Sequence, residues 1–375
     1  MNRARFTGAR RLAVTFLEIS VCAVLPMLAL VYIFDLAAGD GKATDFETAL
    51  YGAGEALRRG DSPYPAADDP IFLRGLAYVY PPLTAIASVP LTLLPVGAAG
   101  IAVMVLLTAG VAATLLILGV RDWRCYGLAY AWPPVFSAIQ TGNVTIPLAL
   151  CAALTWRFRT RAWGAGASIG LGLAIKLFLW PLTVWLAASR RYAEALVSIV
   201  VASVLLVLSW VVIGFKGFRE YPDLLERLED LLGAQAYTVY ALGLDLGLSS
   251  GAARALWIAL GVALLALVVV MARRGDERRA FVLALAATLA CTPLVWLHYF
   301  ALLLVAVAIS EPRLGPAWFV PLAMYLSTAT HNGTTFQTIL TIAAAALTVA
   351  AALRPAWPRG QAVLTPSSSA AGGRP

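Results

Sequence analysis

The sequence predicts an all-α polytopic membrane protein with about 12–13 transmembrane or re-entrant helices and one amphipathic helix in an outer loop. The first supporting observation is composition: of 375 residues, 61% are hydrophobic and 13% are charged, and the mean hydropathy is +0.81. Soluble domains carry about 25% charged residues, so a soluble enzyme and a disordered protein are excluded. The second observation is a series of apolar runs separated only by short polar breaks.

The first apolar run, 12 to about 34, follows four arginines within residues 1–11. At roughly 20 residues per span it is long enough to cross a bilayer. No small-residue cleavage site follows it convincingly, so we expect an uncleaved anchor. Residues 1–11 then form a basic cytoplasmic N-terminus, and 12–353 form the transmembrane domain. Further apolar segments lie near 82–95, 98–120, 125–140, 143–156, 162–175, 177–188, 192–213, 251–272, 280–297, 299–310, 315–330 and 335–353.

Acidic and basic residues are distributed unevenly along the chain. Of the 20 carboxylates, 13 lie in two loops, 36–80 and 214–250, whereas arginines cluster beside apolar runs, for example at 157–161 and 190–191. Short Arg-rich loops remain cytoplasmic by the positive-inside rule. We therefore expect both acidic loops outside, and a hairpin that turns near Lys176. The net charge of +8 is a signal of membrane topology, and nucleic acid is excluded as a partner.

The apolar segments cannot all be full crossings if every arginine cluster is cytoplasmic. Counting 82–95 and 98–120 as two full crossings would place Arg121 and Arg124 outside, so one segment is expected to be re-entrant or miscounted. The sequence does not say which. The glycines of 162–175 predict close helix packing through small residues rather than a dinucleotide-binding loop. The tail, 354–375, is rich in Gly, Ser and Pro and is expected to be disordered.

The first acidic loop contains the signals of a short helix. Thr44 and Glu47 have the spacing of a capping box, and Gly60 is a residue type that commonly ends a helix. The pattern predicts a helix of about four turns, lying at the membrane surface with its apolar side down. The apolar residues that share one face at helical spacing are Phe46, Leu50, Ala53 and Leu57.

Asp45 is the candidate catalytic group, because it would be the first residue of this helix. The helix dipole favours an ionised carboxylate at that place, so Asp45 is expected to be able to accept a proton. The alternative is that Asp45 only helps to start the helix.

Two cationic or ionisable groups stand out within apolar surroundings. Lys176 lies between two apolar stretches, where an ionisable group is expensive and is a functional candidate by default. A structural ion pair or snorkelling at a hairpin turn is the alternative. His298 is one of two histidines, and a lone histidine at a helix end is more often simply hydrogen-bonded.

Tyr64 and Tyr80 are either interface anchors or a stacking surface for a sugar ring.

The order of these motifs resembles glycosyltransferase family 87, of the GT-C superfold. The resemblance spans roughly residues 10 to 350. The motifs that carry it are Asp45-Phe46 with Tyr51, Gly60-Asp61-Ser62-Pro63-Tyr64, Tyr80-Pro81-Pro82, Gly142-Asn143, Lys176, and Pro293 with Trp296-Leu297-His298-Tyr299. The family usually shows Gly-Gln-x-Asn where this chain has Gln140-Thr141-Gly142-Asn143.

The resemblance implies transfer of a mannosyl or arabinosyl group from a polyprenyl-phosphate donor to a lipid or glycan acceptor. The reaction would take place on the outer face of the bacterial inner (plasma) membrane. Asp45 would be the catalytic base of an inverting transfer, Lys176 and His298 would bind the donor phosphate, and substrate would contact the residues Tyr64, Tyr80, Gln140 and Asn143. No metal-ligand cluster is visible in the sequence, so neither a metal nor another cofactor is expected.

Two other classes of protein compete with this interpretation. A flippase or transporter of lipid-linked sugars should distribute ionisable residues over several midplane helices and show internal repeats. Here the carboxylates gather in outer loops. A membrane scaffold without activity would have no use for a carboxylate on a capped loop helix.

Overall fold

The computed structural model describes residues 12–38, 43–66, 69–74, 77–327 and 333–354. The expected basic N-terminus, 1–11, and the expected disordered tail beyond residue 354 lie outside the described residues. The described part is almost entirely helical and contains no strand. Five of its helices are long and apolar enough to cross a membrane: Leu12–Asp35, Val96–Ile117, Tyr192–Val212, Ser250–Arg273 and Thr335–Leu353. The predicted fold class is confirmed.

The helices follow the apolar segments of the sequence closely. The α-helices are α2 (Leu25–Ala38), α3 (Gly52–Arg59), α4 (Pro82–Ser88), α5 (Val96–Ile117), α6 (Trp123–Ala131), α7 (Pro133–Thr141), α8 (Thr145–Arg157), α9 (Ala162–Ile175), α10 (Trp180–Ala188), α11 (Tyr192–Val212), α12 (Tyr221–Leu232), α13 (Val239–Asp245), α14 (Ser250–Arg273), α15 (Glu277–Ala290), α16 (Leu303–Ser310) and α17 (Thr335–Leu353). Two π-helical turns are η1 (Ser20–Val24) and η2 (Phe46–Tyr51). The 3₁₀ segments are η3 (Pro70–Arg74), η4 (Val89–Leu93), η5 (Gly233–Gln235), η6 (Leu297–Leu302), η7 (Pro316–Trp318) and η8 (Val320–Leu326).

Two segments differ in detail from the sequence-based expectation. The segment 125–140 is divided into α6 and α7 at Trp132, whose ψ of 125° is not helical. The cause is Pro133, because a proline pushes the preceding residue out of the helical region. The second acidic loop, 214–250, is largely helical and contains α12 and α13.

The arginine clusters meet at one end of the helix bundle. Glu277, at the start of α15, pairs with Arg159 at 3.1 Å and also with Arg191. Arg124 pairs with Glu18 of the first span at 2.9 Å. The two groups are connected through the segment after α16, because Arg278 of α15 donates to Ser310 and the backbone N of Leu314 donates to Asp122. The turns at 121–124, 157–161 and 190–191 therefore share one end with the beginning of the first span, as the charge pattern predicted for the last two.

The segment 82–93 resolves the number of crossings. The hydroxyl of Tyr64 donates to the carbonyl of Tyr80 just before α4, and Tyr51 donates to the carbonyl of Leu94 just after η4. A Cβ on Gly54 of α3 would lie 3.0–3.2 Å from atoms of both α4 and η4. Both ends of this segment are thus tied to the end that carries α3, so 82–93 is the re-entrant segment and α5 is the next full pass.

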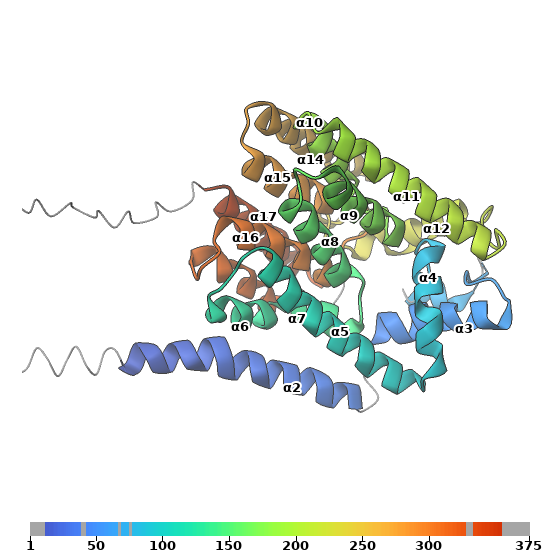
Figure 1. Ribbon diagram of the computed structural model, residues 1–375, viewed down its shortest axis with the longest axis horizontal. Coiled ribbons are helices and arrows are strands. Elements are labelled where there is room, and N and C mark those ends of the chain that lie inside the picture. The colour runs from blue at the N-terminus through green and yellow to red at the C-terminus, as the bar shows by residue number, and fades with distance from the viewer. Residues whose placement is uncertain (1–11, 39–42, 67–68, 75–76, 328–332, 355–375) are drawn as a thin grey trace, which may run out of the picture.

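Figure 1 shows α2 along one edge of the bundle beside α5, α6 and α7, while α3, α4 and α12 gather at one end. Helix α9 packs closely on α11, because Gly166 and Gly170 leave no room for a side chain: an added Cβ would lie 2.6 Å from Glu194 O and 2.7 Å from Val201 Cβ, respectively. This confirms the packing role predicted for the glycines.

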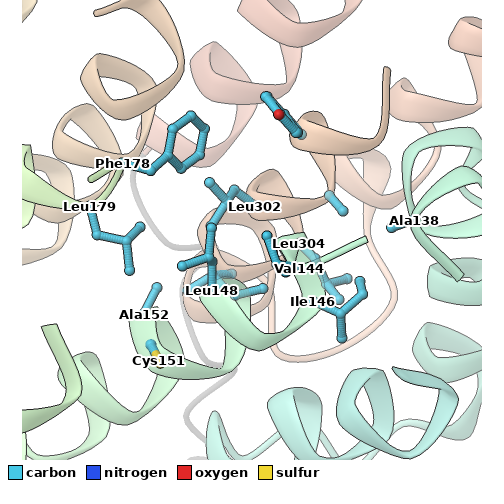
Figure 2. Packing of buried hydrophobic residues seen from close by; sticks show 14 of the residues in the cluster. Ala138, Val144, Ile146, Leu148, Cys151, Ala152, Phe178, Leu179, Leu302 and Leu304 are labelled. Atoms are coloured by element: carbon cyan, nitrogen blue, oxygen red, sulfur yellow. The ribbon is translucent and has the colours of Figure 1, made fainter. Parts of the chain in front are cut away.

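The centre of the core lies beside α8. Figure 2 shows Leu148 and Ile146 of α8 facing Leu302 and Leu304, with Phe178 on the neighbouring segment between α9 and α10. All five side chains are at most 3% exposed. Because protein interiors are close-packed, this cluster fixes η6 and the α9–α10 break relative to α8, and these segments carry His298 and Lys176.

Candidate active site

Asp45 lies near the start of a helix that runs from Thr44 to Arg59 and contains the π-helical turn η2. The helix ends at Gly60, with a φ of +80°, as expected. Thr44 is itself helical, so the predicted capping box with Thr44 as the cap residue is wrong. Single π-helical turns are frequent at functional sites, and this one begins at the residue after Asp45.

The apolar face of this helix does not lie on lipid, as the sequence suggested. Phe46, Leu50 and Ala53 are at most 6% exposed and belong to the protein core, packed against α4, η4 and α5. The expectation of an interfacial helix is therefore wrong, and the helix is an integral part of the site end of the bundle. Its rigid packing fixes the position of the Asp45 carboxylate.

Asn143 is the direct partner of Asp45. Its Nδ2 donates to Asp45 Oδ2 at 2.7 Å, while its Oδ1 accepts from the backbone N of Thr145 at 2.9 Å and from the Thr145 hydroxyl. The bonds to Thr145 cap the start of α8 and set the orientation of the amide, so that its N–H₂ faces the carboxylate. We predicted substrate contact for Asn143, and the structure shows a contact with Asp45.

Gly142 brings Asn143 to Asp45. It has a φ of +70° at the end of α7, and a Cβ there would lie 2.6 Å from Phe46 Cβ. Two requirements thus favour glycine: the left-handed backbone and the close approach of two segments. Gln140 lies half-buried in the last turn of α7 and is not among the cavity-lining residues of the described chain.

Replacing Gly142 by alanine is expected to reduce activity more than stability. Gly119→Ala is the matched control, because Gly119 has a φ of +80° with nothing within 4 Å of the added Cβ. Both variants lose about 1–2 kcal/mol to left-handed strain, but only Gly142→Ala displaces Phe46 and the neighbouring Asp45. Thermal unfolding and initial rates of the sugar transfer that the family resemblance implies measure the two effects, and equal activity in both variants would contradict the positioning role of this turn.

Lys176 lies at the break between α9 and α10, as the hairpin prediction required. Its Nζ donates to the Tyr299 hydroxyl and lies 3.8 Å from the centroid of the Tyr299 ring and 5.4 Å from that of Tyr80. Cations are attracted to such ring faces. Burial lowers the pKa of Lys176 to about 7, and the nearby charge of Asp45 opposes this shift.

Burial acts on Asp45 in the opposite direction. Its side chain is 25% exposed, and loss of water raises the pKa of the carboxyl above its ordinary value. The hydrogen bond from Asn143 and the charge of Lys176 both lower the pKa and partly offset the burial. The sequence predicted that the helix dipole would favour the ionised carboxylate, whereas in the folded chain burial, the largest cause of the shift, raises the pKa of Asp45.

His298 is the third predicted residue beside Asp45. Its side chain is 2% exposed, and Nε2 lies 3.9 Å from Asp45 Oδ2, which is too long for a hydrogen bond. Among the described residues, neither ring nitrogen has a hydrogen-bond partner. A buried polar group without a partner costs free energy, so this imidazole is poised to bond with Asp45 or a ligand after a small movement.

Asp45, Tyr80, Asn143 and Lys176 line one cavity of about 570 Å³. The rest of its lining comes mainly from α12, the start of α14 and the loop after α15; the charged residues among these are Glu226, Glu229, Asp230 and Arg254. Arg254 pairs with Glu229 at 3.1 Å. The sequence analysis did not select these wall residues, because the approach of α12 and α14 to Asp45 is a tertiary contact. Tyr299 was recognised only as a neighbour of His298.

Tyr64 lies in an aromatic cluster. Its ring stacks on Trp210 at 5.5 Å between centroids and contacts Tyr78 and Tyr221. Its hydroxyl donates to the carbonyl of Tyr80 at 3.0 Å. Tyr64 thus supports the segment that carries Tyr80, and Tyr80 is the member of the pair that lines the cavity.

Fold and site together define a multi-pass helical membrane protein with a carboxylate and a lysine in one cavity at one end of the bundle. Comparison with known proteins makes the class specific. The family model Glycosyltransferase family 87 matches residues 78–299. The chain belongs to this family of glycosyltransferases.

A curated relative supports the same assignment. It is the polyprenol-phosphate-mannose-dependent alpha-(1-2)-phosphatidylinositol pentamannoside mannosyltransferase of Mycolicibacterium smegmatis (strain ATCC 700084 / mc(2)155). The two sequences are 25% identical over 307 residues, which cover 77% of this chain and 67% of the relative. No solved structure matches the chain.

Proposed function

We propose that this protein transfers a hexose, mannose in particular, from a polyprenyl-phosphate donor to a hydroxyl of a lipid or glycan acceptor. The observation that carries the proposal is that Asp45 and Lys176 line the same cavity, within reach of one substrate pair. The family assignment supports glycosyl transfer, and the name of the mycobacterial relative supports the donor.

Asp45 is the general base in this proposal. The acceptor oxygen forms a bond to the anomeric carbon, the bond from that carbon to the donor phosphate breaks, and the acceptor proton passes to Asp45. One displacement of this kind inverts the anomeric configuration. A general base works best with a pKa near the operating pH, and burial moves the pKa of Asp45 upward in that direction.

Lys176 stabilises the leaving group. The polyprenyl phosphate departs with additional negative charge, and a cation in a site with little water is effective in stabilising such charge. The Tyr299 hydroxyl holds Nζ at the cavity wall. His298 is assigned to the same centre, where the one N–H of its neutral ring can donate to Asp45 or to the phosphate.

We place the site on the outer face of the bacterial inner membrane. The arginine clusters meet at the end of the bundle that carries Glu277, and by the positive-inside rule that end is cytoplasmic. The Asp45 end is then outside. Labelling of a single cysteine at residue 61, introduced into a variant without the four native cysteines, tests this orientation in intact cells; protection from an impermeant reagent would contradict it.

Transfer and transport can be separated in one experiment. Purified protein in vesicles receives radiolabelled polyprenyl-phosphate mannose and membrane lipids. Label in a new product supports the glycosyltransferase. Movement of the donor between leaflets without a new glycosidic bond supports a flippase instead.

The pH dependence of transfer should be bell-shaped. Activity is expected to rise as Asp45 loses its proton, above its ordinary pKa of 3.8, and to fall as Lys176 loses its proton near pH 7. In Asn143→Asp the cap of α8 is retained, but the donor to Asp45 becomes an acceptor. The acidic limb should therefore move to higher pH, because the hydrogen bond that lowers the pKa of Asp45 is lost. A pH–rate profile with an unmoved acidic limb would contradict this.

A further inference from the structure

A second cavity, of about 320 Å³, lies between α13, α14, α15, α16 and α17. Its lining is almost entirely apolar, and examples are Tyr237, Trp257, Leu264, Phe300, Ala346 and Leu353. Two of its walls, α14 and α17, are candidate membrane spans. We call it the apolar groove.

The apolar groove and the active-site cavity share one wall. Ala290 and Val295 line the groove, whereas the residues between them, 291–294, and the next residue, Trp296, line the active-site cavity. The backbone N of Tyr237 donates to the carbonyl of Val295 at 2.7 Å and fixes this wall to the start of α13. Along η6, Tyr299 lines the cavity and Phe300, the next residue, lines the groove.

Small residues keep the groove open. Five alanines of α15 and α17 line it: Ala286, Ala290, Ala345, Ala346 and Ala350. The Trp257 indole donates to the carbonyl of Ala290 at 2.6 Å. This hydrogen bond holds the ring in place as one side of the groove. The space is therefore preformed, with an apolar lining that suits hydrocarbon and offers a sugar few partners.

We propose that the apolar groove holds the first isoprenoid units of the donor's lipid chain; this rests on the proposed function. In a polyprenyl phosphate the hydrocarbon begins directly at the phosphate. A phosphate at the Lys176 Nζ, which bonds to Tyr299, would therefore place the start of its chain beside η6, where the next residue, Phe300, lines the groove. A glycerophospholipid has a glycerol between its phosphate and its chains and fits this short connection less well.

The test compares two substitutions of exposed alanines on α17: Ala346→Phe in the groove lining and Ala343→Phe outside it. Each is assayed with mannosyl phosphate on a full-length polyprenol and on a geranyl chain. Ala346→Phe is expected to raise the KM for both donors by at least about tenfold, because the geranyl chain also supplies the first isoprenoid units and burial of two methylene groups alone corresponds to about that factor. Ala343→Phe should leave both KM values unchanged.

Photo-crosslinking gives a second readout that does not need activity. A polyprenyl phosphate with a diazirine on its first isoprene unit should label groove-lining residues of η6, α14 or α17 in the wild type, and less so in Ala346→Phe. Labelling elsewhere, labelling displaced by phosphatidylglycerol as readily as by polyprenyl phosphate, or equal KM values for the two variants would overturn the assignment. Groove labelling without any sugar transfer would contradict the proposed function while retaining the lipid site.

Discussion

Replacing Asp45 by asparagine is expected to lower kcat of sugar transfer by about 10²- to 10⁴-fold, the range that general-base catalysis supplies. The variant is nearly isosteric and keeps an oxygen that can accept the hydrogen bond from Asn143 Nδ2. Folding and donor binding should therefore remain near normal. Rates with radiolabelled polyprenyl-phosphate mannose, together with equilibrium binding of the donor, measure the two properties separately.

Asp61→Asn is the matched control. Asp61 follows the end of the same helix, and its side chain is 63% exposed and pairs with Arg59. An exposed pair of this kind contributes little to stability, so activity should stay close to that of the wild type. If Asp45→Asn retains activity within a few-fold of the wild type, Asp45 is not the base.

Replacing Lys176 by methionine is expected to lower kcat/KM by about 10²- to 10³-fold, the usual effect of removing one group that stabilises charge in a transition state. The methionine keeps most of the apolar stem between Tyr80 and Tyr299 but cannot donate to a phosphate. The alkaline limb of the pH–rate profile, which we assign to Lys176, should disappear in this variant. Its acidic limb should move to higher pH, because the lysine charge lowers the pKa of Asp45.

Lys216→Met is the matched control, because it removes a lysine charge at the same end of the bundle as Asp45 but outside the cavity. Lys216 donates to the carbonyl of Gly60 in an exposed region, away from the residues that line the cavity. Its profile should keep both limbs. A Lys176→Met profile that also keeps its alkaline limb near pH 7 would remove Lys176 from the mechanism.

The sequence predicted the local elements well, because apolar length, proline and glycine act on neighbouring residues. Lys176 was placed correctly at a hairpin turn between α9 and α10. Gly60 ends the Asp45 helix as expected. The capping box failed because the helix begins at Thr44, a shift of one residue that local patterns resolve poorly.

The environment of that helix was not accessible from its pattern. An amphipathic helix buries its apolar face against lipid or against protein with the same spacing of side chains. Only the packing of α4, η4 and α5 shows that Phe46 and Leu50 face protein. The same contacts identify 82–93 as the segment that turns back.

By itself, the sequence determined a helical membrane protein with its arginines at one end, since hydropathy and charge are properties of the residues themselves. It also selected Asp45, Lys176 and His298 as candidates. Only the tertiary structure decided that these three approach one another, that Asn143 orients Asp45, and that an apolar groove adjoins their cavity. The physical reason is that each depends on contacts between segments distant in the chain, and burial at those contacts also shifts the pKa values of Asp45 and Lys176.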